Sequence, residues 1–228
     1  MEGPFLYRMP KKIVKWIFFD NDGILVDTET LYFQANREIL GSIGIDLTRE
    51  LFMQVSMQQG RSTFVLAQQR GVDSATLERL HDIRNKRYAD LLSGGVPIIK
   101  GVADALKKLD GKVSMGVVTS CRKIHFDLIH RQTGLLQFFN FIITTEDVDH
   151  TKPDPEPYLQ ALRKSGCRAS DCLVIEDSER GLAAANAAGI DCIVIPNPLS
   201  ANGNFNGALA VLDDIRLVLD YIKLSSSN

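Results

Sequence analysis

Five short apolar runs, separated by segments with helical periodicity, constrain the fold of this chain most strongly. They are Ile13–Phe19, Val113–Val118, Phe139–Thr144, Cys172–Ile175 and Cys192–Ile195. Continuous apolar runs of this length are typical of strands buried on both faces. Helical patterns lie between most of them, over Val102–Leu109, Ile124–Gln132, Pro157–Ser165 and Gly181–Ala188. This alternation predicts an α/β fold with a parallel, Rossmann-like sheet flanked by helices, whose ligands bind beyond the carboxyl ends of the strands.

The stretch from Leu31 to Gly95 differs from the rest of the chain because it shows helical periodicity and no clear buried strand. Its candidate helices are Thr30–Ile43, Thr48–Val55, Ser62–Arg70 and Ser74–Leu92. An interruption of roughly 65 residues is far longer than an ordinary crossover, which favours an inserted all-α cap domain over a continuation of the core. We therefore expect residues 1–30 and 98–228 to form the α/β catalytic core and residues 31–97 to form the cap.

Composition excludes several classes of function. The formal net charge of −2 provides no bulk electrostatic argument for binding nucleic acid or an anionic membrane. Residues 192–212 carry no charge, but their prolines and asparagines are poorly suited to lipid. Residues 1–12 lack the long apolar core of a secretory signal, and the serine-rich tail at 225–227 is expected to be disordered. The four cysteines lack metal-type spacing, so we expect reduced thiols in a cytoplasmic protein, for which a monomer is plausible.

Two predicted strands end in pairs of acidic residues. One runs directly into Asp20 and Asp22, and another runs into Glu176 and Asp177. Two unpaired anions held close together are unfavourable unless a cation lies between them or one of them carries a proton. Ordinary alternatives exist for both pairs. The first could belong to a turn at Gly23, and the second could favour the dipole of a following helix.

A hydroxyl pair and a lysine complete the pattern. Thr119 and Ser120 follow an apolar run and precede a helical segment, where they could form a phosphate cradle or an ordinary helix cap. Lys152 is the only cation of the proline-rich loop Thr151–Pro155, and its ordinary interpretation is a solvated lysine. Because the carboxyl ends of parallel strands meet at one edge of a sheet, the four clusters together predict a single site.

The chemistry of these groups suits phosphoryl transfer. Asp20, Asp177 and the main-chain carbonyl of Asp22 could hold Mg²⁺, which prefers oxygen ligands. The metal and Lys152 would neutralise a phosphoryl group, while Thr119 and nearby amides donate hydrogen bonds to its oxygens. One carboxylate can act as the nucleophile. The neighbouring acid can protonate the leaving oxygen and then activate water.

Four motifs together resemble the haloacid dehalogenase-like hydrolase superfamily, in particular the beta-phosphoglucomutase-like phosphatases with a small helical cap. They are Asp20-Asn-Asp-Gly-Ile-Leu-Val-Asp-Thr-Glu29, Val117-Val-Thr-Ser120, Lys152-Pro-Asp-Pro155 and Glu176-Asp-Ser-Glu-Arg-Gly-Leu-Ala-Ala-Ala185. The motifs occur in family order over nearly the whole chain, and the helical insertion lies where the cap belongs. The resemblance implies a Mg²⁺-dependent phosphatase that acts on a small phosphorylated metabolite, such as a sugar or polyol phosphate.

The resemblance also implies roles for individual residues. Asp20 would be the nucleophile and a Mg²⁺ ligand, and Asp22 would be the general acid/base. Thr119 would bind the transferring phosphoryl group, and Lys152 would bridge Asp20 and the phosphate. Family dehalogenases lack the second aspartate of the first motif, because a halide leaving group needs no acid. The presence of Asp22 therefore favours phosphate esters.

The same resemblance implies the metal ligands and the substrate contacts. Besides Asp20 and the backbone carbonyl of Asp22, the Mg²⁺ ligands would be Asp177 and, directly or through water, Glu176. Substrate contacts would come from Ser120, from Arg61 in the cap and from Arg122, although both arginines could be ordinary surface residues. Cys121 lies near the phosphate cradle, where an inert thiol and a redox-sensitive one are the two alternatives.

Two other functions compete with the phosphatase. A sugar-phosphate mutase of this family has a cap histidine twelve positions after the nucleophile, and this chain has Tyr32 there. A non-catalytic binding protein on the same scaffold would usually have lost a catalytic group. The nucleophile, the acid/base, the hydroxyl, the lysine and the metal ligand are all present, which favours an enzyme.

Overall fold

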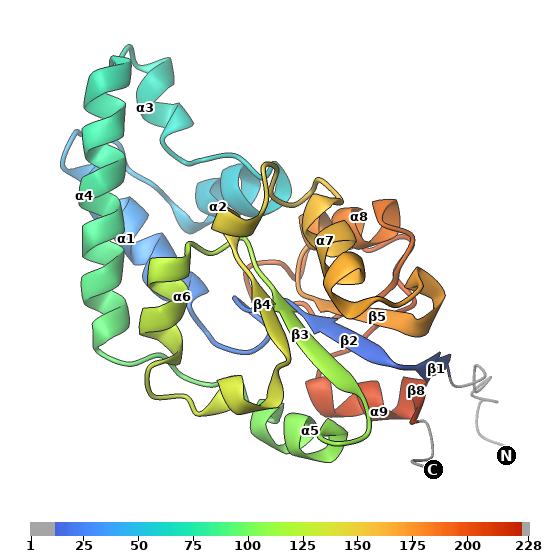
Figure 1. Cartoon of the computed structure of the whole chain (residues 1–228). Helices are drawn as coiled ribbons and strands as arrows, with labels where there is room; N and C mark the ends of the chain where they lie inside the picture. The colour runs from blue at the N-terminus through green and yellow to red at the C-terminus, as the bar shows by residue number, and fades with distance from the viewer. Residues whose placement is uncertain (1–11, 225–228) are drawn as a thin grey trace, which may run out of the picture.

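The computed structural model describes residues 12–224, in which a six-stranded parallel sheet lies at the centre (Figure 1). The strand order is β4-β3-β2-β5-β6-β7, and all neighbouring strands run parallel. The strands are β2 (Trp16–Phe19), β3 (Ser114–Val118), β4 (Phe141–Ile143), β5 (Cys172–Glu176), β6 (Asp191–Val194) and β7 (Ala210–Val211). The predicted α/β fold is confirmed. The predictions for the N-terminal segment before Lys12 and for the serine-rich tail lie outside the described residues.

Helices cover both faces of the sheet. They are α5 (Val102–Leu109), α6 (Lys123–His130), α7 (Glu156–Ser165), α8 (Glu179–Ala187) and α9 (Val218–Tyr221), with short helical turns η2 (Leu135–Phe138), η3 (Thr145–Asp147), η4 (Ala169–Asp171) and η5 (Ile215–Leu217). Successive side chains of a strand point to opposite faces. Ile17 and Phe19 therefore join one hydrophobic cluster, with residues of α5 and α6, while Phe18 joins another with residues of α7 and α8.

The run Ile13–Phe19 forms two strands rather than the single predicted one. β1 (Lys12–Val14) pairs with β8 (Ile222–Leu224) in a separate two-stranded sheet, and β2 begins at Trp16. The break falls at Lys15, whose side chain reaches Asp171 on the surface at 3.1 Å. The backbone of Lys15 bonds to Asp171 and Ser114 beside the central sheet, so the run passes from one sheet to the other at this residue.

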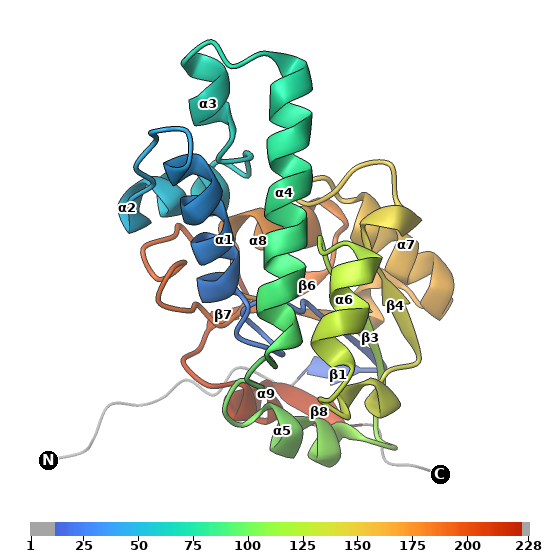
Figure 2. The ribbon, with the colours of Figure 1, turned by 90° about the vertical axis from the view of Figure 1, so that its left-hand side faces the viewer.

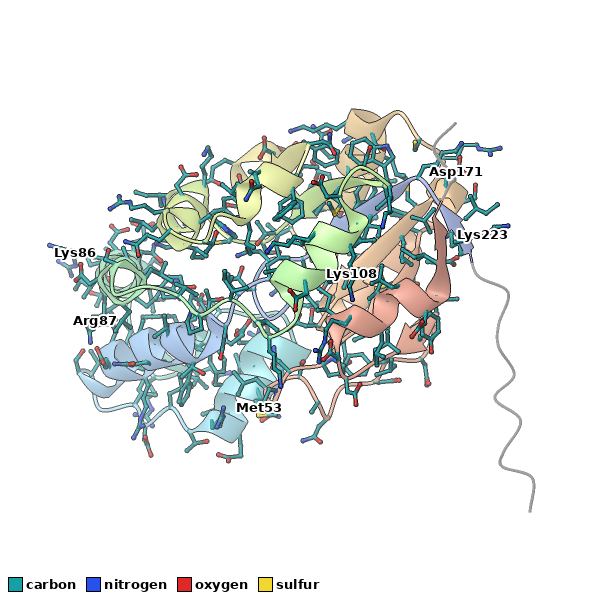
Figure 3. The ribbon with its side chains drawn as sticks, turned by 90° about the horizontal axis from the view of Figure 1, so that it is seen from below. Met53, Lys86, Arg87, Lys108, Asp171 and Lys223 are labelled. Carbon is teal, nitrogen blue, oxygen red and sulfur yellow. The ribbon has the colours of Figure 1, made fainter. Side chains whose placement is uncertain are left out.

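An inserted all-α cap separates β2 from β3, as predicted, and extends away from the sheet in Figures 1 and 2. It comprises α1 (Glu29–Gly41), α2 (Arg49–Phe52), the π-helix η1 (Met53–Gln58), α3 (Val65–Gln69) and α4 (Ser74–Ser93). A hydrophobic cluster that includes Phe52 and Phe64, together with Leu199 from outside the cap, holds these helices together. On the outer surface, Arg87 of α4 forms an ion pair with Glu38 of α1 at 2.6 Å, and Arg87 points away from the core in Figure 3.

Among residues 12–224, no helix has both the length and the apolar composition needed to traverse a bilayer.

Candidate active site

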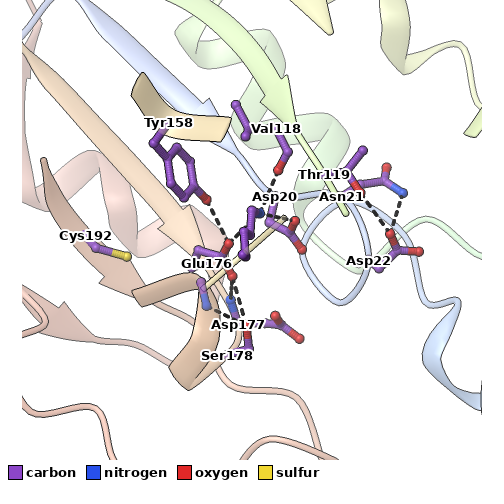
Figure 4. Close-up of polar contacts among 12 residues, drawn as sticks. Asp20, Asn21, Asp22, Val118, Thr119, Tyr158, Glu176, Asp177, Ser178 and Cys192 are labelled. Carbon is purple, nitrogen blue, oxygen red and sulfur yellow. Dashed lines mark hydrogen bonds and ion pairs between the residues drawn. The ribbon is translucent and has the colours of Figure 1, made fainter. Parts of the chain in front are cut away.

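The carboxyl ends of β2, β3 and β5 bring the predicted polar clusters together at one edge of the sheet. β2 lies between β3 and β5 and pairs in parallel with both. Asp20, Thr119 and Glu176 therefore lie at neighbouring strand ends, and Figure 4 shows them around a common centre. Lys152 lies in the segment between β4 and α7, and its side chain reaches the same centre.

Lys152 lies within this cluster and is only 4% exposed, so the alternative of a solvated lysine is wrong. Its Nζ donates to Asp20 Oδ1 at 2.6 Å, to Glu176 Oε1 at 2.6 Å and to the Val118 carbonyl at 2.7 Å, which uses all three ammonium protons. Burial alone would lower the pKa of Lys152, but the two carboxylates outweigh burial and raise it. The lysine is therefore a fixed cation beside Asp20.

Three acids converge at the same place. Each of Asp20, Glu176 and Asp177 offers an oxygen within 4.8 Å of the others, and all three residues are buried. Burial raises the pKa of Asp20 to about 7, against the opposing effect of Lys152 and with the help of the neighbouring acids. Burial, followed by the charges of Asp20 and Glu176, also raises the pKa of Asp177 well above its usual range. Among the residues that the structure describes, these three acids have a single ion-pair partner between them, Lys152.

Glu176 is held by the protein at both of its oxygens. Oε1 accepts from Lys152 and from the Tyr158 hydroxyl, the latter at 2.7 Å, and Oε2 accepts from the Asp177 amide and the Ser178 hydroxyl. A Cβ at Gly181 would lie about 2.0 Å from the Glu176 carboxylate, so only glycine leaves room for it. Glu176 is thus a fixed group with little freedom to move.

The remaining oxygens of the cluster fit a hard cation. Asp20 Oδ2 and Asp177 Oδ1 accept no hydrogen bond from the residues that the structure describes, whereas Asp177 Oδ2 accepts from Asn197 Nδ2 at 2.6 Å. A Cβ at Gly23 would lie 2.2 Å from Asp177 Oδ2, so the glycine keeps this space open. Free carboxylate oxygens that face one another in a buried, negatively charged site match the ligand preference of Mg²⁺.

Asp22 lies beside this cluster, and its carboxylate accepts hydrogen bonds from three side chains. Thr28 Oγ1 donates to Oδ1, and Thr119 Oγ1 and Asn21 Nδ2 each donate to Oδ2 at 3.2 Å. Thr119 in turn accepts from the Cys121 amide at 2.9 Å. The predicted acid/base is therefore separate from the Lys152 contact but lies on the wall of the same pocket.

A second layer of polar groups supports Asp22 from behind. The fully buried Asn21 contacts His130 Nε2 through Oδ1 at 2.7 Å, and His130 Nδ1 lies 2.9 Å from the Thr133 hydroxyl. Burial lowers the pKa of His130 to about 4, so the ring is neutral at neutral pH. Because Asn21 Oδ1 can only accept, the proton of this neutral ring belongs on Nε2. The hydrogen bonds then run in one direction, toward the Asp22 carboxylate.

A pocket of about 370 Å³ joins the cluster to the cap. The three predicted substrate contacts, Ser120, Arg61 and Arg122, all line it. Ser120 Oγ is buried without a hydrogen-bond partner among residues 12–224, and neither arginine forms an ion pair there. Tyr32 also lines the pocket, and its hydroxyl accepts from Arg84 at 2.6 Å. The cap therefore contributes the basic residues Arg61 and Arg84 to the pocket, and the core side adds Ser120 and Arg122 as further donors.

Burial and the nearby aspartates raise the pKa of the Cys121 thiol well above its usual range. A thiol with a raised pKa forms little thiolate, which favours the inert alternative over a redox-sensitive one.

Several residues of the site escaped the sequence analysis. Tyr158 holds Glu176, Asn197 holds Asp177, His130 supports Asn21, and Arg84 reaches into the pocket. Asn197 lies in the uncharged stretch 192–212, whose composition argued only against a membrane span, so no signal there pointed to the site. The other three look like ordinary helix residues, and no local pattern distinguishes them.

Fold and site together define a hydrolase of the phosphomonoesterase class with a helical cap. Residues 17–195 match the model of the haloacid dehalogenase-like hydrolase family, and the chain belongs to this family, in its phosphatase group. The predicted family and the predicted class of enzyme are therefore confirmed.

Relatives support the same conclusion. The protein CbbY of Cupriavidus necator is 31% identical over 212 residues, which cover 86% of this chain and 84% of that protein. The phosphorylated carbohydrates phosphatase of Thermotoga maritima is 30% identical over 182 residues, or 78% of this chain and 82% of that enzyme. A mutant of CbbY from Rhodobacter sphaeroides, solved in complex with xylulose-(1,5)bisphosphate, shares the fold with a TM-score of 0.79 and 23% identity, over 92% of this chain and 100% of that one.

Proposed function

We propose that the protein is a Mg²⁺-dependent phosphatase that hydrolyses a small phosphorylated metabolite, of the sugar- or polyol-phosphate kind, through a phosphorylated Asp20. The observation that carries the proposal is the buried contact between Asp20 and Lys152 inside a cluster of three acids at the base of the pocket. A phosphate ester is itself an anion, so the cluster can accept it only together with a cation.

For the metal we propose Asp20, Asp177 and the main-chain carbonyl of Asp22 as protein ligands. Glu176 would contribute through water, because both of its oxygens already accept hydrogen bonds from the protein. Bound Mg²⁺ would neutralise the acids and stabilise negative charge on the phosphoryl oxygens. The donor set of carboxylate and carbonyl oxygens is the kind that Mg²⁺ selects.

The protein groups would then act in two steps. In the first, an Asp20 oxygen attacks phosphorus, the phosphorus–oxygen bond of the ester breaks, and protonated Asp22 gives its proton to the leaving alkoxide. In the second, the Asp22 carboxylate takes a proton from water, which attacks the same phosphorus and releases Asp20 and inorganic phosphate. Both residues return to their starting states.

Lys152 and Thr119 would hold the phosphoryl group during both steps. Lys152 already contacts Asp20, and a phosphoryl oxygen bound there would share its charge. The Thr119 hydroxyl and the unpartnered Ser120 hydroxyl are donors for further phosphoryl or substrate oxygens. Arg61 and Arg122 would contact the part of the substrate that reaches toward the cap.

The names of the relatives guide the choice of substrate, because one is a phosphorylated carbohydrates phosphatase and another was solved with a sugar bisphosphate. We propose residues 31–97 as the cap domain, and residues 1–30 and 98–228 as the catalytic core, with the cap excluding bulk water from the pocket. We further propose a cytoplasmic monomer without nucleic-acid or membrane partners, and the four free cysteines are consistent with a reducing compartment.

The test is a screen for phosphate release across phosphorylated sugars, polyols and small acids, with Mg²⁺ and with excess chelator. We expect release that depends on Mg²⁺ and is lost in Asp20→Asn, which leaves the fold intact by circular dichroism. Full activity in chelator would contradict the metal assignment, and full activity in Asp20→Asn would contradict the nucleophile.

The two alternative functions give different results in the same screen. A sugar-phosphate mutase would isomerise a hexose phosphate without net release and would need a bisphosphate activator. A non-catalytic protein would bind one of the compounds without converting it. Either pattern would replace the proposed phosphatase.

A further inference from the structure

The turn that follows β6 contacts the candidate metal site and the cap at the same time. Asn197 Nδ2 donates to Asp177 Oδ2 at 2.6 Å, while Asn197 Oδ1 accepts from the backbone amides of Leu199 at 2.7 Å and Ser200 at 3.1 Å. The Leu199 side chain is 4% exposed and belongs to the hydrophobic cluster that is otherwise made of cap residues. In Figure 2 the chain after β6 passes below α2, whose Phe52 belongs to the same cluster. Asn197 and Leu199, two positions apart in one turn, therefore contact the candidate metal site and the cap, respectively.

The turn is held together by its own hydrogen bonds. The Asn197 amide donates to Ser200 Oγ at 3.0 Å, and the Ser200 amide donates to the Asn197 carbonyl at 3.1 Å, so the turn is closed on both sides. Pro196 and Pro198 fix a backbone dihedral on each side of Asn197. The amides of Leu199 and Ser200 thus hold the Asn197 side chain at its oxygen, which ties its position to the turn.

The side chain of Asn197 contacts Asp177, a proposed metal ligand. The hydrogen bond from Asn197 occupies one oxygen of Asp177 and leaves Oδ1 without a partner among the described residues. A carboxylate held in this way presents its second oxygen in a fixed direction. Polar partners that orient metal ligands contribute about 10–100-fold to metal affinity in other proteins.

We propose that Asn197 and Leu199 are positioning residues that couple the cap to the metal site: Leu199 anchors the turn in the cap, and Asn197 orients Asp177 for the metal. This inference rests on the proposed Mg²⁺ site. The coupling is reciprocal, because a contact that favours metal binding is itself favoured when the metal binds.

The first test measures Mg²⁺ affinity of the full-length protein by titration calorimetry. We expect Asn197→Ala to weaken binding by about 10-fold or more. Leu199→Ala should weaken binding several-fold, and Leu199→Met should restore most of the loss. Leu80→Ala is the matched control, since Leu80 belongs to the same cap cluster but lies on α4 rather than on the turn. In the double variant, Leu199→Ala should add nothing to Asn197→Ala.

The second test measures the reverse direction by hydrogen exchange and needs no variant of Leu199. Mg²⁺ should slow the exchange of cap amides near Phe52 in the wild type, and this protection should disappear in Asn197→Ala. Wild-type affinity in Asn197→Ala or in Leu199→Ala, equal losses in Leu199→Ala and Leu80→Ala, or cap protection that persists in Asn197→Ala would overturn the coupling while leaving the phosphatase intact. A wild-type protein that binds no Mg²⁺ would overturn the proposed metal site and the coupling with it.

Discussion

Replacement of Asp20 by asparagine should stabilise the metal-free protein while it abolishes turnover. In the folded state the pKa of Asp20 is raised from 3.8 to about 7 by burial and by its acidic neighbours. A raised pKa means that ionised Asp20 opposes folding. This loss of stability grows as the pH rises from 3.8 and is complete above pH 7. A shift of this size corresponds to about 4 kcal/mol at about 1.4 kcal/mol for each pKa unit.

Asparagine has nearly the same shape and no charge, so it resembles the protonated carboxyl, and the attraction of Lys152 for ionised Asp20 is already included in the raised pKa. We therefore expect a net gain of about 2–4 kcal/mol in the free energy of unfolding at pH 8. The assay is urea unfolding in excess chelator, followed by the fluorescence of Trp16, the single tryptophan. Asp82→Asn on the exposed face of α4 is the matched control and should change stability by less than about 0.5 kcal/mol.

Added Mg²⁺ should reverse the order of the two proteins, because the wild type gains stabilisation from binding the metal and Asp20→Asn has lost a ligand. An Asp20→Asn protein that is equal to or less stable than the wild type in chelator would refute the reasoning. It would mean that the three acids are not under electrostatic strain without a metal.

Three further predictions concern groups around the site. Asp22→Ala should slow hydrolysis of an alkyl phosphate by about 100-fold or more, but that of an aryl phosphate much less, because a phenolate leaves without an acid; equal losses on both substrates would contradict the role. His130 is neutral when folded, because burial lowers its pKa to about 4. Below pH 6.5, the usual pKa of histidine, the unfolded chain binds a proton at His130 that the folded chain does not, so stability should fall as the pH falls. Between pH 7 and pH 4 the wild type should lose about 3 kcal/mol more than His130→Gln in urea unfolding, and equal losses would show that His130 is not buried in neutral form. Gly181→Ala should reduce stability and phosphate release despite the better helix propensity of alanine, because its Cβ would displace Glu176, and a stabilised, active variant would contradict this contact.

Much of the fold followed from local sequence. The predicted runs Cys172–Ile175 and Cys192–Ile195 are apolar without interruption, and the ends of β5 and β6 lie within one residue of them; β3 also lies within one residue of its predicted run, although that run includes Ser114. β7 and β8 could not be predicted, because strands of two and three residues depend on a neighbour that only the folded chain provides. One predicted strand is divided at Lys15 because its first part pairs with β8, which comes from the far end of the chain and cannot be inferred from local sequence.

The residues of the site also fall into two groups, those that local sequence predicts and those that only tertiary packing brings there. The strand-end motifs are local, so the sequence alone predicts that Asp20, Thr119 and the Glu176 pair share one edge of the sheet. The residues that orient them could not be predicted, because Asn197 and His130 reach the site only through tertiary packing. The structure was also needed to show which carboxylate oxygens accept hydrogen bonds from the protein and which accept none from the described residues.

The most direct test of the central claim is to trap the phosphoryl group on Asp20. Asp22→Asn should form the aspartyl phosphate from an aryl phosphate and hydrolyse it slowly, so that rapid acid quenching preserves it for peptide mass spectrometry. The account predicts one phosphoryl group on the peptide that contains Asp20, formed only with Mg²⁺. Release of the phenol and phosphate without any protein-bound phosphoryl group, or with the group on another residue, would contradict the account.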